Sequence, residues 1–402
     1  MSAASAALFL AGTGAAFAQT TTVSCDDATV LPNPVYMAGS SAFEPTLAQL
    51  AVQIKAKRGF SIIYSAIASC NGVSAISDGT PLTGTAHYYT VAPALDGGVS
   101  GGVTTNSCTL PTGTKALIGV ADVAFDSCTG IARPATIGES HGPVQSMLIV
   151  VPKANVTTTA MSMEQAAAIW GCGTKGNQTP FTDDNAIQQR DQTSGSQIML
   201  ARNIGVPEAA FKGTKNSGSG ALLTSLQGVA DPQTAIGFVA ADFYATKRSS
   251  LNAVAFRGRG QTKAYYPDSD ANAVDKRNVR DGHYAVQGPV HMFTSLSAGQ
   301  PTATAQQILD WLTGAKAIDS ADVANTNYVA TVASLGNVPP CAMKVQIDKD
   351  GGNFSPYTPP TSCNCFFEKS AGKLATDPAG CVACTTGAQC SGGKRCQTGY
   401  CE

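Results

Sequence analysis

Short apolar runs alternate with amphipathic segments along the chain from Pro34 onward. VYMAG (residues 35–39), FSIIYSAI (60–67) and ALIGVADVAF (116–125) have the length and the branched or aromatic content typical of buried strands. Between the first two runs, apolar side chains recur at helical spacing, at Phe43, Leu47, Leu50, Ala51 and Ile54. Strands that feed helices in this way predict an α/β protein.

A second series of elements begins at SMLIVVP (146–152), which predicts another strand. A helix is expected over residues 163–170, because Ser162 and Gln165 are placed as a capping box. Beyond it, the pattern predicts helices over 221–227 and 304–314 and extended segments over 234–243 and 284–293. Residues 78–114 are rich in Gly, Thr and Pro, so we expect a long loop there.

Composition narrows the classes of partner. The 402 residues are 43% hydrophobic and carry a formal net charge of -1, which argues against a nucleic-acid-binding surface. A basic stretch with two tyrosines, residues 247–280, could bind a polyanion, but a solvated loop is the favoured interpretation. After the N-terminal run, no segment offers ~20 consecutive apolar residues, so we do not expect a membrane-spanning helix.

Both ends of the chain indicate export. Residues 1–18 are small and apolar and end in Ala16-Phe17-Ala18, which predicts a cleaved signal peptide. Of 13 cysteines, eight lie from Cys341 onward, and in an exported protein this usage indicates disulfides with at least one thiol left over. The close spacing of Cys108 and Cys128 predicts that they pair. Cys381 and Cys384 form a CxxC that could bind zinc, but the tail contains no histidine, so disulfides are favoured.

Small hydroxyl residues follow three predicted strands, at Gly39-Ser40-Ser41, at residues 69–72 and at Ser194-Gly195-Ser196. The first turn of a helix has unpaired N–H groups and can bind an anion, although such clusters are more often simple helix caps. Arg190 precedes the third cluster, and its guanidinium suits a tetrahedral oxyanion. These features together favour an oxyanion site.

Catalytic chemistry has little support. The histidines, His87, His141, His283 and His291, are scattered without metal-ligand spacing, and no nucleophile has an evident base. We therefore expect neither an enzyme, nor a metal site, nor a cofactor.

Eight short segments follow one another over roughly residues 34–315: AGSSAFEPTLAQLA, YSAIASCNG, ADVAFDSC, MSMEQAAAIWGCG, QRDQTSGSQ, NSGSGALLTSLQ, TAIGFVAADF and HYAVQGPVHMF. In this order they resemble the periplasmic phosphate-binding proteins of the ABC phosphate importer. The resemblance implies a type II periplasmic binding protein fold, in which two α/β lobes enclose the ligand. Its expected parts are residues 19–140 with 285–340 as lobe 1, 141–284 as lobe 2, and 341–402 as a proline-rich linker and small disulfide-rich module.

The same resemblance implies the ligand contacts. They fall on Ser40, Ser41, Ala42, Ser69, Asp126, Ser127, Arg190, Ser194, Gly195 and Ser196. Two family aspartates correspond to Ser127, with Asp126 adjacent, and to Gln192, with Asp191 adjacent. A carboxylate that accepts a proton separates phosphate from sulfate, so these shifts leave the oxyanion open.

Two functions remain in view. The first is a monomeric, periplasmic or extracellular protein that captures inorganic phosphate or a related oxyanion, in concert with an ABC permease. The second is a surface structural or adhesion protein that keeps the binding fold and interacts through its Cys-rich tail.

Overall fold

The computed structural model describes residues 23–92 and 102–402. The expected signal peptide, residues 1–18, lies outside the described residues. A large mixed sheet runs through the molecule in the order β1-β5-β4-β3-β2-β6-β14-β7-β11, with β12 also paired to β7. Its strands are β1 (Val23–Ser24), β2 (Pro34–Gly39), β3 (Ser61–Ser65), β4 (Thr85–Val91), β5 (Val103–Thr109), β6 (Ile118–Ala121), β7 (Ile137–Pro152), β11 (Gly237–Ala240), β12 (Leu251–Ala253) and β14 (Gln287–Ser295).

The first lobe is built on parallel β3, β2 and β6. Its helices are α1 (Glu44–Arg58), α2 (Ser69–Ser77), α3 (Phe125–Thr129), α9 (Ala303–Leu312) and α10 (Thr326–Ser334). Leu47, Leu50 and Ile54 of α1 are buried, as their helical spacing predicts.

The second lobe surrounds the later half of β7, where β11 and β12 pair with it antiparallel. Its helices are α4 (Met163–Cys172), α5 (Gly195–Ile204), α6 (Ser219–Gly228), α7 (Ala241–Lys247) and α8 (Arg277–Arg280). Four short strands accompany them: β8 (Ala160–Ser162), β9 (Gln188–Gln189), β10 (Thr214–Lys215) and β13 (Ala255–Arg257). The capping box of Ser162 and Gln165 is present at α4, which confirms that prediction.

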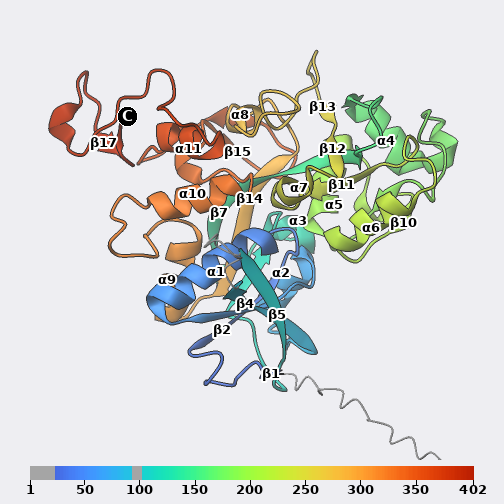
Figure 1. The fold of residues 1–402 in the computed structure, drawn as a ribbon. Coiled ribbons are helices and arrows are strands. Elements are labelled where there is room, and N and C mark those ends of the chain that lie inside the picture. The colour runs from blue at the N-terminus through green and yellow to red at the C-terminus, as the bar shows by residue number, and fades with distance from the viewer. Residues whose placement is uncertain (1–22, 93–101) are drawn as a thin grey trace, which may run out of the picture.

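The strands β7 and β14 connect the two lobes. β14 pairs with β6 and with the first half of β7, and β7 then continues into the second lobe (Figure 1). The two-lobed α/β fold expected from the sequence is therefore present, and the pocket described below lies where the lobes meet. The exact domain bounds stay a prediction.

One prediction of local structure was wrong. Within the expected loop 78–114, β4 and β5 form an antiparallel pair in full register from Thr85↔Thr109 to Val91↔Val103. Threonine and tyrosine favour strands, and the pairing with β3 supplies a packed face that the polar composition does not reveal.

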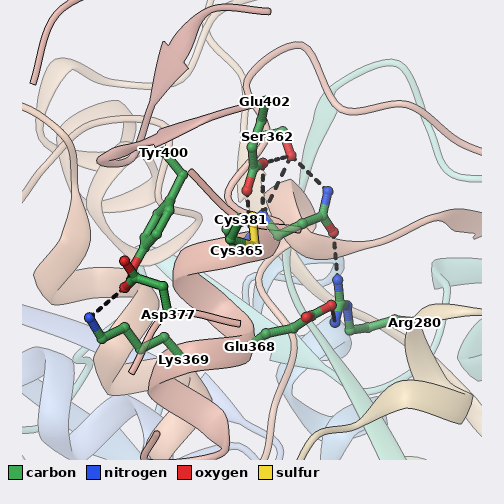
Figure 2. Close-up of a disulfide and its surroundings, with 10 residues drawn as sticks. Arg280, Ser362, Cys365, Glu368, Lys369, Asp377, Cys381, Tyr400 and Glu402 are labelled. Atoms are coloured by element: carbon green, nitrogen blue, oxygen red, sulfur yellow. Dashed lines mark hydrogen bonds and ion pairs between the residues drawn. A yellow bond between two sulfur atoms is a disulfide. The ribbon is translucent and has the colours of Figure 1, made fainter. Parts of the chain in front are cut away.

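The C-terminal residues contact both lobes. They contain β15 (Val345–Ile347), β16 (Phe354–Pro356), α11 (Asn364–Ala371), β17 (Cys396–Gln397) and β18 (Tyr400–Cys401). Helix α11 packs against α10, and Phe367 belongs to the main hydrophobic core. The guanidinium of Arg280 on α8 donates to Ala342 O at 2.9 Å. It also donates to Glu368 Oε1 of α11 at 2.9 Å, and Figure 2 shows these two side chains side by side. No helix in residues 23–92 or 102–402 is long and apolar enough to span a membrane.

Disulfides hold this C-terminal region together. They join Cys341–Cys363, Cys365–Cys381, Cys384–Cys396 and Cys390–Cys401. Both cysteines of the CxxC are thus in disulfides, as favoured over zinc. Cys172 is the free thiol among the described residues, and it is exposed.

The expected Cys108–Cys128 pair is wrong. Cys108 of β5 bonds to Cys25 beside β1, and Cys128 of α3 bonds to Cys70 of α2. Closeness in sequence misled because β5 and α3 lie on different parts of the first lobe.

Candidate functional site

A small pocket lies between the two lobes at the ends of several strands. It is lined by Ser40, Ser41, Ala42, Ala68, Ser69, Asp122, Arg190, Ser194, Gly195 and Ser196. All of these except Ala68 and Asp122 were expected site residues. The structure therefore brings most of the expected set together, from segments far apart in the chain.

The first-lobe wall is centred on Asp122, which follows β6. Its carboxylate accepts hydrogen bonds from Ser40 Oγ at 2.6 Å and from Ser69 Oγ at 3.2 Å. Burial raises the pKa of Asp122 to about 6, although the two hydroxyl bonds and the charge of Arg190 act in the opposite direction. The pocket thus contains a carboxylate that is ready to accept or share a proton near neutral pH.

The backbone of this wall is unusual at Ala68, the residue before α2. Its φ of 81° lies in the left-handed region that residues with a Cβ rarely adopt. Such conformations cost about 1–3 kcal/mol and are concentrated at binding and active sites. Ser69 follows Ala68 in the first turn of α2, where its hydroxyl donates to Asp122.

The second-lobe wall is centred on Arg190, which is buried. Its Nε donates to Asn216 O at 3.2 Å, and Nη2 donates to Ser217 O at 3.1 Å. Within residues 23–92 and 102–402, no carboxylate forms an ion pair with this guanidinium. Burial lowers the pKa of Arg190, while Asp191 and Asp122 act in the opposite direction.

The start of α5 completes this wall. Ser194 precedes the helix, and Gly195 and Ser196 form its first turn, where N–H groups have no intrahelical partners. The hydroxyl of Ser196 is buried, and no hydrogen-bond partner is found for it among the described residues. A buried polar atom without a partner at a helix start favours a ligand there.

The two walls approach each other closely at Gly195. A Cβ at this position would lie 2.7 Å from Asp122 Oδ2 and would also collide with Ser69 Oγ. Two hydrogen bonds join the lobes here. Cys70 N of the first lobe donates to Thr193 O of the second at 3.1 Å, and Arg190 Nη2 of the second lobe donates to Ser41 Oγ of the first at 3.3 Å. Only glycine fits at position 195 in this arrangement.

Two expected site residues lie elsewhere. Asp126 is exposed on α3, and Ser127 Oγ donates to Asp350 Oδ2 at 2.6 Å, outside the pocket. Asp350, between β15 and β16, also accepts from Ala124 N at 2.8 Å, so a carboxylate of the C-terminal region binds the residue before α3. The expected position was wrong because β6 ends at Ala121. The first residue beyond this strand end, Asp122, is the one that faces the pocket.

Asp122 was the residue that sequence reasoning missed. Its signal was available, because it is the first polar residue after the apolar run that ends at Ala121. Gln192, which the resemblance aligns with a second family aspartate, is exposed. The adjacent Asp191 accepts from Thr193 N at 2.9 Å within its own turn.

Structural comparison supports the fold. The chain is similar to a phosphate-bound substrate-binding protein from Clostridium perfringens, at 16% identity and a TM-score of 0.50 over 76% of this chain and 99% of the other. An ABC-type phosphate transport receptor from Vibrio cholerae aligns at 14% identity and a TM-score of 0.46, over 76% of this chain and 100% of the other. No protein-family profile and no curated protein sequence matches the chain. The feature shared with the Clostridium perfringens protein is thus the periplasmic binding protein fold.

Proposed function

We propose that this chain is an exported solute-binding protein that captures inorganic phosphate between its lobes. The observation that carries the proposal is the buried guanidinium of Arg190, which forms no ion pair with a carboxylate among the described residues and lies in one pocket with the first turn of α5. A tetrahedral oxyanion supplies the negative charge that the guanidinium lacks, and it supplies acceptors for the N–H groups at the start of α5. The phosphate bound to the similar Clostridium perfringens protein supports the same ligand.

Asp122 favours phosphate over sulfate. A carboxylate beside the anion can accept the proton of hydrogen phosphate, whereas sulfate has no proton to donate near neutral pH. A buried pair of anions without a shared proton repels strongly. The selectivity proposed here therefore depends on Asp122, and not on Asp126 or Ser127.

Location and partner follow as parts of the proposal. The disulfides of both the first lobe and the C-terminal region suit an oxidising compartment such as the periplasm or the cell exterior. An ABC permease is the partner that an exported oxyanion-binding protein would supply with its ligand.

The test is calorimetric titration of the purified chain with phosphate, sulfate and molybdate at pH 7. We expect heat from phosphate and little from sulfate. Asp122→Asn should reduce the preference for phosphate over sulfate by at least about tenfold, because an amide can donate to an unprotonated anion. Absence of binding to every oxyanion contradicts the proposal, and unchanged selectivity in Asp122→Asn contradicts the role of the carboxylate.

A further inference from the structure

Two histidines that are far apart in the chain face each other across the strands that connect the lobes. His141 lies on β7 directly opposite His291 on β14. Glu139 is two residues before His141 on the same strand. Alternate residues of a strand share one face, so the three side chains gather on one side of the sheet.

The distances join these three side chains into one cluster. Glu139 Oε1 lies 2.6 Å from His291 Nδ1 and 3.5 Å from His141 Nε2. One nitrogen of each imidazole and one oxygen of Glu139 lie within 4.8 Å of one another. The second oxygen of Glu139 accepts from Arg133 Nε at 3.0 Å, which fixes the orientation of the carboxylate.

The cluster is buried at one end and open at the other. The side chain of His291 is 7% exposed, that of Glu139 is 19% exposed, and that of His141 is 57% exposed. Nε2 of His291 is buried and has no hydrogen-bond partner among the described residues, so the ring is held at Nδ1 alone. Water therefore has its widest access to the group at His141.

We propose that Glu139, His141 and His291 bind a divalent late first-row transition-metal ion such as Zn²⁺. Imidazole nitrogens with one carboxylate oxygen are ligands that suit Zn²⁺, Cu²⁺ and Ni²⁺, whereas Mg²⁺ and Ca²⁺ prefer oxygen ligands only. Binding of the ion displaces the proton between His291 Nδ1 and Glu139 Oε1, and these two atoms, 2.6 Å apart, move farther apart to accommodate metal–ligand bonds of ~2.0–2.2 Å. Water completes the coordination at the exposed face, and Arg133 acts as the outer partner of the carboxylate.

The proposed metal site lies near the oxyanion pocket. His291 is in register with Ala121 of β6, the residue before Asp122. A dication in the cluster therefore adds positive charge close to the oxyanion pocket. This link to anion binding rests on the proposed function, whereas metal binding itself does not.

The experiment uses the full chain without an affinity tag, treated with EDTA and kept in phosphate-free buffer. A Cys172→Ser background removes the exposed free thiol, which is a competing ligand. Calorimetric titration should show one equivalent of Zn²⁺ bound and no heat from Mg²⁺. His141→Ala should weaken Zn²⁺ binding by at least about tenfold, with a melting temperature that stays near that of the parent because His141 is exposed.

His283→Ala is the matched control, since that imidazole stacks on Tyr265 with ring centroids 5.0 Å apart, outside the cluster. It should bind Zn²⁺ as the parent does. A second readout is the electron paramagnetic resonance spectrum of the Cu²⁺-loaded chain. The spectrum should show two nitrogen ligands in the parent and one in His141→Ala. No Zn²⁺ binding by the parent, or equal affinity in His141→Ala, would overturn the proposal.

Discussion

The first-lobe wall of the pocket places a carboxylate among hydroxyl groups, whereas the second-lobe wall places a guanidinium among carbonyl oxygens. Asp122 is held by Ser40 and Ser69, and Arg190 is held by Asn216 and Ser217. Both charges are buried among neutral partners, with Ser41 of the first lobe also accepting from Arg190, and the two charges do not form an ion pair. Neither charge has an oppositely charged partner among the described residues, so a ligand that carries both negative charge and a proton would complement both walls.

Removing the guanidinium from the second-lobe wall should lower the affinity for phosphate more than any change to the first-lobe wall. Hydrogen bonds to charged groups contribute about 1.5–3 kcal/mol each, so Arg190→Ala should weaken phosphate binding by about 100-fold or more. Calorimetry on the folded variant measures the loss. Arg190→Lys is the control, because it keeps the charge but not the forked donors, and it should be intermediate. Wild-type affinity in Arg190→Ala would remove this wall from the site.

Separating the walls should have the next largest effect. In Gly195→Ala the new Cβ meets Ser69 and Asp122, so the lobes cannot approach as closely. We expect about tenfold weaker phosphate binding, the equivalent of losing one charged hydrogen bond. Gly220→Ala in α6 is the control, since a Cβ there meets no atom within 4 Å. Equal affinity in the two variants would show that the pocket does not close at Gly195.

Asp122 in the first-lobe wall predicts that the free energy of unfolding of the ligand-free chain depends on pH. The pKa of Asp122 rises from 3.8 to about 6 on folding, so the folded state binds the proton more tightly than the unfolded state. Its contribution to the free energy of unfolding is fully present below pH ~4 and is lost as the pH rises through ~6. The loss amounts to about 3 kcal/mol, because each tenfold difference in proton affinity between the two states corresponds to about 1.4 kcal/mol.

Asp122→Asn isolates this contribution, because burial also raises the pKa of Asp242, to about 8. Denaturant unfolding at pH 4, 5, 6 and 7 in buffer without phosphate or sulfate should show a smaller decrease for Asp122→Asn than for the parent. Identical slopes in the two chains would contradict the raised pKa.

The smallest effect is expected outside both walls. Ser127→Ala removes a hydrogen bond to Asp350 but no group of the pocket, so phosphate affinity should change by less than about twofold. Calorimetry beside the parent measures this. A loss comparable to that of Gly195→Ala would return α3 to the site.

The sequence predicted the elements whose signal is local. The capping box at Ser162 marks α4, and the apolar spacing of Leu47, Leu50 and Ile54 marks α1, because each depends on neighbours within one or two turns. The β4 and β5 pair escaped notice because its stability comes from pairing with β3, which composition does not record.

The candidate site shows the same division. Ser40, Ser69, Arg190 and Ser194 stand out because hydroxyl groups and an arginine follow predicted strands or precede helices. The acidic residue of the site was predicted four residues too late, at Asp126 instead of Asp122. The end of β6 decides which acidic side chain reaches the pocket, and the sequence does not mark that end clearly. His141 and His291 could not be joined from sequence, because their contact depends on the register of β7 and β14.

The C-terminal region bears on how long a ligand stays. Arg280 attaches that region to α8 of the second lobe, while Asp350 attaches it to α3 of the first lobe. If the lobes part as rigid bodies, one of these attachments has to break before the pocket opens. On the proposed function, we therefore expect the residence time of the anion to depend in part on this cystine-braced region, which lies outside the lining of the pocket.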